Sequence, residues 1–388
     1  MGNGSDIMSL SGNWSYPTTI RFGAGRIQEL GDACAYAGID KPLLVTDRIL
    51  ADLPITERLL GLLAKARFEK SLFAAVDPNP TDINLEAGIF TFKEGGHDGI
   101  VALGGGSAID LGKLIAFMSN QTRPVWDFED VGDNWRRANP TVIPPIIAVP
   151  TTAGTGSEVG RAGVIFNSKD HVKKIIFHPK VLPSIAICDP ELTVGMPPSI
   201  TVGTGMDAFA HCLEAFSSPL YHPMSHGIAL EGMRLVSEHL PRVVQDANNI
   251  DSRAHMMSAA AMGAVAFQKG LGAVHAISHP VGAIYNTHHG MTNAVVIPAV
   301  LALNRQVIEE KISKAAAYLD INGGFDGFYD FVVGFRQALG VPNRLREMGV
   351  KRDEVERMTK MALIDPSGLG NPVPLNYNNV MDLYETCI

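Results

Sequence analysis

The segment VALGGGSAIDLGKLIA (Val101–Ala116) joins a β-branched strand pattern, three consecutive glycines and a helical pattern. Glycines let backbone N–H groups approach a phosphate closely, and the amino end of the following helix adds a favourable dipole. A plain tight turn is the alternative, but a single glycine would be enough for it. We therefore predict a phosphate-binding loop whose helix opens at Ser107 or Ala108, with Ser107 as its cap.

Strand-like and helix-like segments alternate around this loop. The sequence predicts strands at residues 42–47, 99–106, 145–152 and 184–190, and helices at residues 54–66, 82–94 and 108–118. This alternation is typical of a parallel sheet with crossover helices. After residue 199 helical periodicity takes over, at residues 228–244, 253–266, 294–319, 325–339 and 353–363. The 388-residue chain is too long for one ordinary core, so we predict an α/β dinucleotide-binding domain over residues 1–194 and an all-helical domain over residues 195–388.

Composition restricts the setting in which the protein works. The net charge of −8 and the absence of a Lys/Arg run argue against a nucleic-acid surface. The four cysteines form no CxxC pair, which indicates a reducing compartment and neither a disulfide framework nor a thiolate zinc site. No apolar run of ~18 residues and no signal peptide are recognised, so we expect a cytoplasmic protein without a membrane span. The opening MGNGSDI (residues 1–7) reads as a flexible extension outside the fold.

Asp47 ends the first predicted strand. An acid at the carboxyl end of such a strand commonly binds ribose hydroxyls and repels a 2′-phosphate, which favours NAD over NADP. A helix cap or a solvated turn acid is an equally good interpretation of this residue alone.

Histidines and one acid form a possible metal site in the helical half. Asp207 and His211 in TGMDAFAHCLEAF (residues 204–216) are four residues apart and share one helix face, and His275 and His279 repeat that spacing. A single histidine would ordinarily be a hydrogen-bonded core or surface residue. The set of one acid and several imidazoles favours a divalent transition metal. No GxSxG elbow or P-loop is present, and GTGSEVG (residues 154–160) only loosely approaches the former.

Together these segments resemble the iron-containing (group III) alcohol dehydrogenase family over nearly the whole chain. The motifs that carry the resemblance are PNPT (residues 78–81), GGGSAID, PTTAGTGSE, DPELTVGMP, GMDAFAHCLEAF, GLGAVHAISHPVGAIYNTHHG (residues 270–290) and DPS (residues 365–367). The resemblance implies a dehydroquinate synthase-like fold, with an α/β N-terminal dinucleotide-binding domain and an all-α C-terminal metal-binding domain.

The resemblance also assigns the helical site. The metal, Fe²⁺ or alternatively Zn²⁺, is expected on Asp207, His211, His275 and His289. His279 is expected beside substrate and nicotinamide as a proton relay. The usual family pattern has one histidine before the glycine, whereas this chain has His288 and His289, so a swap between these two stays open. Because His279 directly precedes Pro280, we expect the helix to end or kink there.

On the dinucleotide side the resemblance points to eight residues: Asp47, Asn79, Gly105, Gly106, Ser107, Thr151, Thr152 and Lys173. Lys174 stands beside Lys173 and makes that assignment ambiguous. Arg161 could favour a carboxylated substrate, although an ion pair is the better interpretation.

The reaction implied is reversible hydride transfer between an alcohol and NAD, with a bound metal as Lewis acid. We expect a small-molecule alcohol or aldehyde as substrate, no nucleic-acid or membrane partner, and a homodimer or higher homo-oligomer. The alternatives are a glycerol-dehydrogenase-like or dehydroquinate-synthase-like enzyme of the same fold, or a non-catalytic NAD- and metal-binding subunit.

Overall fold

The computed structural model describes residues 16, 18–170 and 172–388, so the predicted extension at residues 1–7 lies outside the described residues. The chain divides into two compact units that are not continuous along the sequence. The sheet unit comprises Pro17–Ala208 and Leu235–Ala264, and the helical unit includes Phe209–Arg234 and Val265–Ile388. The boundary after residue 194 stays a prediction, since these units are defined by packing and not by a single cut.

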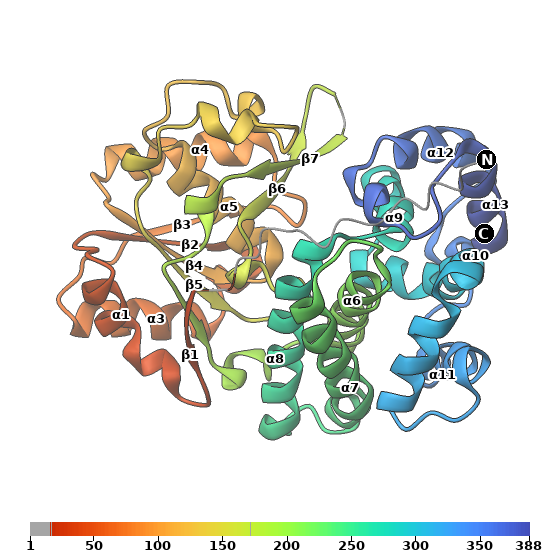
Figure 1. Ribbon diagram of the computed structural model, residues 1–388. Helices are drawn as coiled ribbons and strands as arrows, with labels where there is room; N and C mark the ends of the chain where they lie inside the picture. Colours follow the sequence, from red (N-terminus) through yellow and green to blue (C-terminus); the bar gives the residue numbers. More distant parts are fainter. Residues whose placement is uncertain (1–15, 17, 171) are drawn as a thin grey trace. The chain divides into compact units, whose positions relative to one another are not determined.

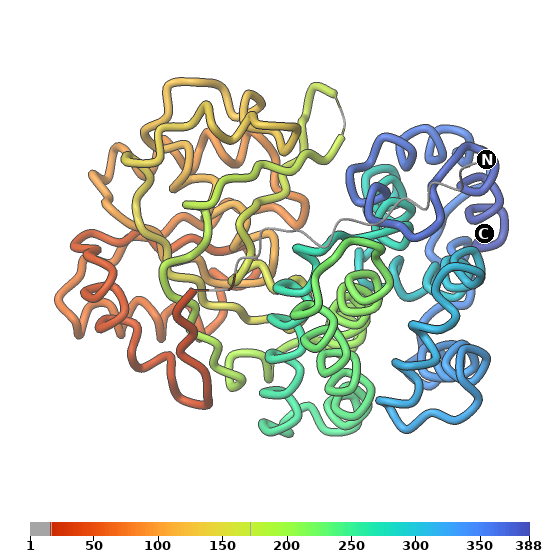
Figure 2. Tube along the Cα trace, in the orientation of Figure 1, coloured from red at the N-terminus to blue at the C-terminus, as the bar shows by residue number. Residues whose placement is uncertain are grey.

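The sheet unit is built on six parallel strands in the order β1-β8-β5-β4-β2-β3. Figure 1 labels five of these strands, and Figure 2 follows the same chain as a tube. Their bounds are β1 Thr19–Phe22, β2 Pro42–Asp47, β3 Leu72–Val76, β4 Gly99–Gly104, β5 Ile146–Pro150 and β8 Ile185–Cys188. The central strand β4 pairs with β2 through Leu44 and Val101, and with β5 through Val101 and Ile147. The parallel α/β architecture predicted from the sequence is confirmed.

Apolar cores lie on both faces of this sheet, because successive side chains of a strand point to opposite sides. Ile100 and Ala102 of β4 pack with α4 (Asp82–Glu94) and α5 (Gly106–Met118). Val101 and Leu103 pack on the other face with α1 (Leu30–Tyr36) and α3 (Pro54–Lys65). The strands therefore read as continuous apolar runs, which is typical of a sheet covered on both faces.

Several elements escaped the sequence analysis. The strands β1 and β3 are short, stand at the two edges of the sheet and have partly exposed residues, so their apolar pattern is weak. The antiparallel hairpin of β6 (Ala162–Asn167) and β7 (Val172–Phe177) was missed as well. A short helix α2 (Arg48–Ala51) follows β2 directly.

Helices make up the rest of the chain after β8. Their bounds are α6 Pro198–Ser217, α7 Pro223–Gln245, α8 Ile250–Ala266, α9 Ala273–Tyr285, α10 His289–Tyr318, α11 Gly324–Ala338, α12 Val355–Leu363 and α13 Tyr377–Cys387. Within the helical unit α10 packs against α9, α11 and α13 (Figure 1). By length and composition α10 could span a membrane, but 61% of its most apolar window is buried inside the protein, as in the core helix of a globular domain.

The helix α9 does not end at Pro280, and this part of the sequence prediction was wrong. It continues to Tyr285 and is closed by Asn286, which adopts the left-handed conformation with φ 52°. Proline removes one helical hydrogen bond, and the burial of neighbours such as Ile277 and Val281 offsets that cost.

Candidate active site

The loop between β4 and α5 has the close backbone packing that a phosphate site needs. Gly104 has φ +142°, which favours glycine, and Gly105 caps α5 without any side-chain hydrogen bond. A Cβ on Gly106 would lie 2.6 Å from Cγ2 of Thr155, and a Cβ on Gly105 would lie 3.3 Å from Thr152. The first turn of α5 therefore presents backbone N–H groups that no side chain caps.

Ser107 does not cap α5, contrary to the sequence prediction. The helix already begins at Gly106, and the Ser107 hydroxyl donates to the carbonyl of Pro78 over 2.6 Å. This bond places Ser107 beside the PNPT segment, in which Asn79 directly follows Pro78. Two sequence-predicted dinucleotide segments are thus brought together.

The threonines after β5 meet the same loop. The backbone N–H of Thr151 donates to the carbonyl of Gly104 over 3.0 Å, and Thr152 lies against Gly105. The Thr151 side chain is buried. Four of the predicted dinucleotide residues, Gly105, Gly106, Thr151 and Thr152, therefore lie around one strand-to-helix junction.

Asp47 caps a helix with one carboxylate oxygen and keeps the other oxygen near the glycine loop, so its role toward ribose stays a prediction. Its Oδ1 accepts hydrogen bonds from the backbone N–H groups of Ile49 and Leu50, both over 2.9 Å, and so caps α2. Its Oδ2 faces the glycine loop, 3.6 Å from the position of a Cβ on Gly104. A carboxylate oxygen remains directed at the loop, as a ribose-binding acid requires.

Lys173 and Lys174 lie on opposite faces of the β6–β7 hairpin, since successive side chains of a strand alternate. Lys174 forms an ion pair with Glu129 over 3.0 Å and lies above the Trp126 ring. Burial lowers the pKa of Lys173, and the nearby Asp110 opposes that shift. The ion pair assigns Lys174 a structural role and leaves Lys173 as the candidate for the dinucleotide.

A buried polar network that the sequence analysis missed fastens α5 to the GTGSE loop. Lys113 Nζ donates to the Ser157 hydroxyl over 2.7 Å and to the Ser157 carbonyl over 3.0 Å, and it pairs with Asp110 over 3.2 Å. Asp110 also accepts from the Ser157 hydroxyl and, over 3.0 Å, from the backbone N–H of Val164. Beside it, burial raises the pKa of Glu158 to about 7, which Lys113 partly opposes. The spacing DLGK on a buried helix was the available signal.

Arg161 interacts with an aromatic ring and with a nearby carboxylate. Its guanidinium lies 5.4 Å from the Phe177 ring centroid, and Asp130 raises its pKa against a larger lowering by burial. This supports the electrostatic pairing that the sequence analysis preferred over a substrate role.

Metal-ligating atoms from three helices converge at one point. Asp207 of α6, His275 of α9 and His289 of α10 each offer one ligand atom, and these atoms all lie within 4.8 Å of one another. Asp207 and His275 are buried. One carboxylate and two imidazoles are a donor set that fits Fe²⁺ or Zn²⁺.

His211 lies next to this group but is not part of it. Its ring stacks on that of His275 with centroids 4.7 Å apart, and it contacts the ring of Phe267 at 5.0 Å. Its assignment as a metal ligand therefore stays a prediction.

His288 and His289 have different positions. His288 is the cap of α10, where its Nδ1 accepts from the backbone N–H of Met291 over 3.4 Å. His289 belongs to the convergent group. The structure therefore supports His289 over His288 at the metal position.

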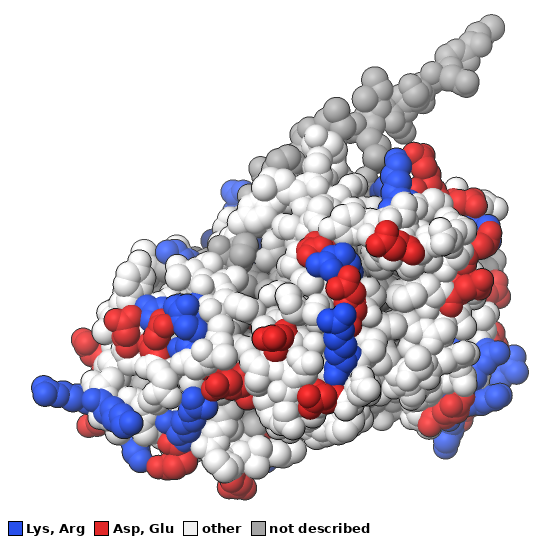
Figure 3. Space-filling view, turned by 90° about the horizontal axis from the view of Figure 1, so that it is seen from below, with Lys and Arg blue, Asp and Glu red and all other residues white. Residues whose placement is uncertain are grey.

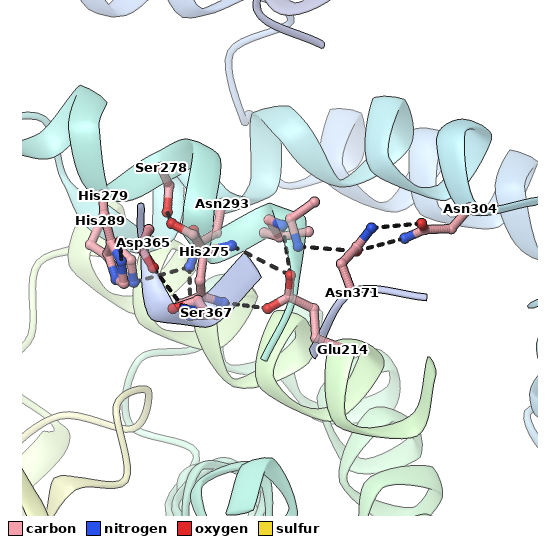
Figure 4. Close-up of polar contacts among 12 residues, drawn as sticks. Glu214, His275, Ser278, His279, His289, Asn293, Asn304, Asp365, Ser367 and Asn371 are labelled. Carbon is pink, nitrogen blue, oxygen red and sulfur yellow. Dashed lines mark hydrogen bonds and ion pairs between the residues drawn. The ribbon is translucent and has the colours of Figure 1, made fainter. Parts of the chain in front are cut away.

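Glu214 orients His275, and the sequence analysis did not single it out. One carboxylate oxygen accepts from Nδ1 of His275 over 2.5 Å, and the other accepts from the backbone N–H of Val274 over 2.6 Å (Figure 4). The buried carboxylate thus holds Nδ1, and Nε2, which lies 3.4 Å from Nδ2 of Asn293, is the ring atom that a metal would use. Its position one helical turn after His211 was the signal in the sequence.

Asp365 holds His279 in the same way. Its Oδ2 lies 2.8 Å from Nδ1 of His279, while its Oδ1 accepts from the backbone N–H of Ser367 over 2.9 Å (Figure 4). Burial raises the pKa of Asp365. The interactions with His279 and the hydrogen bonds from Ser367 together lower this pKa by more, so the net shift is downward. His279 stacks on His289 with centroids 5.3 Å apart, so it stands beside the convergent donors.

The comparisons with known proteins agree with this geometry. Residues 17–190 match the family model "Iron-containing alcohol dehydrogenase", and residues 201–388 match "Fe-containing alcohol dehydrogenase family, C-terminal". The chain is 38% identical over 370 residues to 4-hydroxybutyrate dehydrogenase of Cupriavidus necator, covering 92% of this chain and 94% of that protein.

Solved structures show the same fold. A 1,3-propanediol oxidoreductase has a TM-score of 0.92 at 32% identity, covering 97% of this chain and 99% of that one. Sulfoacetaldehyde reductase from Bifidobacterium kashiwanohense, in complex with NAD⁺, has a TM-score of 0.89 at 27% identity, covering 98% and 99%. Both the resemblance and the fold class predicted from the sequence are confirmed. The protein belongs to the iron-containing alcohol dehydrogenase family and acts as an alcohol dehydrogenase or aldehyde reductase on small molecules.

Proposed function

We propose that the protein uses NAD and a divalent iron to interconvert a small alcohol and its aldehyde. Asp207, His211, His275 and His289 hold the metal in this proposal, with Zn²⁺ as the alternative ion. The observation that carries it is the convergence of Asp207, His275 and His289 within 4.8 Å. A carboxylate behind His275 strengthens the fit, since metal-bound histidines almost always donate their second N–H to an acceptor.

The glycine loop supports the dinucleotide half of the proposal. A Cβ would clash with Thr155 at Gly106 and would be tight against Thr152 at Gly105, so glycine suits both positions. No side chain caps the backbone N–H groups that begin α5, which supports a phosphate there. The solved relative from Bifidobacterium kashiwanohense was obtained with NAD⁺. Oδ2 of Asp47 faces the loop with a negative charge, which favours NAD over NADP.

Two carboxylates of this protein orient the histidines that the proposed reaction needs. A bound metal supplies Lewis-acid polarisation of the substrate oxygen. Asp365 fixes His279 through Nδ1, which leaves Nε2 as the atom that can take or return the alcohol proton. Glu214 fixes His275 in the same orientation. His275 and His279 are thus both oriented by a carboxylate at Nδ1, but we assign the first to the metal and the second to proton transfer.

The proposal extends to the cellular setting, which the cysteines and the surface charges support. All four cysteines are free and buried, which fits a reducing compartment such as the cytoplasm. Basic side chains lie beside acidic ones on the face seen in Figure 3 and do not gather into a basic patch there. We infer a cytoplasmic homo-oligomer with no nucleic-acid or membrane partner.

The substrate is best sought among short oxygenated alcohols. The relatives carry the names of 4-hydroxybutyrate and 1,3-propanediol. We infer that either a terminal carboxylate or a second hydroxyl is accepted. Arg161 is not assigned to the carboxylate, because Asp130 and Phe177 already engage it.

The test is NADH formation after anaerobic loading with Fe²⁺ or Zn²⁺, using ethanol, 1,3-propanediol and 4-hydroxybutyrate. We expect turnover with at least one alcohol and far less with NADP. A dehydroquinate-synthase-like lyase would consume its substrate without net NADH, so product analysis separates that alternative. Tight NAD and metal binding without turnover on the panel, in either direction, would instead favour a non-catalytic subunit.

A further inference from the structure

A cavity of about 500 Å³ lies in the helical unit, among α10, α11, α13 and the segment between α11 and the 3-10 helix η9 (Leu345–Met348). Its apolar wall is formed mainly by α10, through Val295, Pro298, Ala299, Ala302 and Leu303, with Leu383 of α13. Its polar lining includes Arg336 and Arg344. None of these residues belongs to the convergent metal group or the glycine loop.

Arg336 is a buried cation that forms no ion pair with a described carboxylate, although the charge of Glu347 acts on it from a longer distance. The residue is 8% exposed. Nη1 donates to the carbonyl of Val295 over 3.2 Å, and Nε has no hydrogen-bond partner. Among the described residues no carboxylate lies within ion-pair distance of this guanidinium. A buried cation of this kind is costly unless a negative charge accompanies it.

A second cation increases the positive potential of the cavity. Arg344 donates to the carbonyl of Thr386 and likewise forms no ion pair with a described residue. Burial lowers the pKa of Arg336 and the nearby charge of Arg344 lowers it further, whereas Cys387, Tyr329 and the carboxylate of Glu347 oppose this shift. Asp382, the carboxylate that lines the cavity, is exposed and pairs with neither arginine.

We propose that this cavity is a binding site for a small aliphatic carboxylate. The carboxylate group would accept hydrogen bonds from Arg336 and Arg344, since guanidinium groups match carboxylate geometry. The carbon chain would pack on the wall of Val295, Pro298 and Ala302, which a mineral anion would leave uncovered. The site is separate from the proposed active site and does not depend on the assignment of NAD or metal.

Hexanoate is the probe, with hexanamide as its uncharged match and inorganic phosphate as the anion without a chain. Isothermal titration of the full-length protein should show hexanoate binding, weaker phosphate binding and no hexanamide binding. Arg344→Gln should weaken hexanoate about tenfold, because one charge-assisted hydrogen bond is lost. Arg305→Gln is the matched control, since Arg305 stands on the same helix α10 but is paired with Asp326.

Two further variants keep the test independent of folding. Arg336→Lys retains the charge and should bind hexanoate more weakly. Ala302→Leu should narrow the cavity along its apolar wall and weaken hexanoate binding while the protein stays folded. Hexanoate binding that is unchanged in Arg344→Gln and Ala302→Leu would place the ligand elsewhere and overturn the proposal. A second outcome would also overturn it: the protein binds no hexanoate, and sedimentation velocity shows a dimer that Arg344→Gln dissociates. A second chain would then cover the cavity.

Discussion

Asp365 and His279 stand 86 residues apart in the sequence, yet Oδ2 of one lies 2.8 Å from Nδ1 of the other. His279 shares α9 with His275, whose Nδ1 is held by Glu214 over 2.5 Å. Each histidine is therefore oriented by a carboxylate from a different segment of the helical unit. In our proposal this arrangement separates His275, a metal ligand, from His279, a proton relay, although the two histidines lie four residues apart on one helix.

Replacing Asp365 should reduce turnover without removing the metal. Asp365→Asn deprives His279 of its charged acceptor, and loss of such an orienting partner typically costs 10- to 100-fold, roughly, in activity. His279→Ala should behave similarly and keep its metal. The measurements are kcat and metal content on the same preparation, with Asp382→Asn as the control carboxylate. A metal-free His279→Ala would make His279 a ligand.

Loss of a convergent ligand should empty the metal site. His275→Ala is expected to lose the metal and all activity, while NADH binding persists because β4 and α5 carry the glycine loop. His211→Ala decides whether the histidine stacked on His275 is also a ligand, as the family resemblance implies. Metal analysis and NADH titration are the measurements, and His255→Ala on the exposed part of α8 is the control. Full metal occupancy in His211→Ala would remove that residue from the ligand set.

Asp47 should control the choice between NAD and NADP. Asp47→Asn keeps an oxygen for the α2 cap but removes the charge that faces Gly104, so kcat/KM with NADP should rise relative to NAD. Asp47→Gly should do the same and lose only a few tenths, roughly, of a kcal/mol of stability at the cap. Equal use of both cofactors by the unmodified protein would show that Asp47 does not meet the ribose.

A methyl group at Gly106 should damage dinucleotide binding. Its Cβ would lie 2.6 Å from Cγ2 of Thr155, so Gly106→Ala must displace one of the two loops. We expect the Kd for NADH, measured by fluorescence, to rise about tenfold, in line with the cost of overpacking. Gly61→Ala is the matched control: nothing lies within 4 Å of its Cβ, and α3 should gain ~0.5–1 kcal/mol. Equal affinities in both variants would contradict the close packing of the loop.

Glu158 should make stability depend on pH. Burial raises the pKa of Glu158 in the folded protein to about 7, against partial opposition from Lys113. Folding therefore favours the neutral form of Glu158. The contribution of this form to the free energy of unfolding is fully present below the unfolded pKa of 4.5 and is lost as the pH rises through about 7. Relative to Glu158→Gln, the unmodified protein should lose up to about 3 kcal/mol between pH 5 and pH 8.

Denaturant unfolding of both proteins across that range is the measurement. The buried groups that face Glu158 are Lys113 and Cys188, and both remain in the variant. Parallel pH profiles for the two proteins would show that Glu158 is not neutral in the fold.

Local patterns were sufficient for the parts of the site that depend on one element. The apolar runs of β2, β4 and β5 predict a covered parallel sheet, and the three glycines before α5 predict a bare phosphate loop, because each follows from the backbone of a few neighbouring residues. The four-residue spacings of Asp207 with His211 and of His275 with His279 place each pair on one helix face for the same reason.

Tertiary packing decided what those patterns left open. Ser107 bonds to Pro78 instead of capping α5, and α9 runs through Pro280 instead of ending there. Among the histidines, only packing shows that His289 meets Asp207 while His288 caps α10.

The sequence by itself determined the two architectural halves, the glycine loop and the histidines from which a metal site is made. The tertiary structure decided which of those histidines converge and which carboxylates orient them. Glu214 and Asp365 lie 61 and 86 residues from their histidines, and no local periodicity encodes contacts over such separations. They arise only when burial of the apolar faces of α6, α9 and the segment after α12 brings the polar groups of these segments within hydrogen-bond distance.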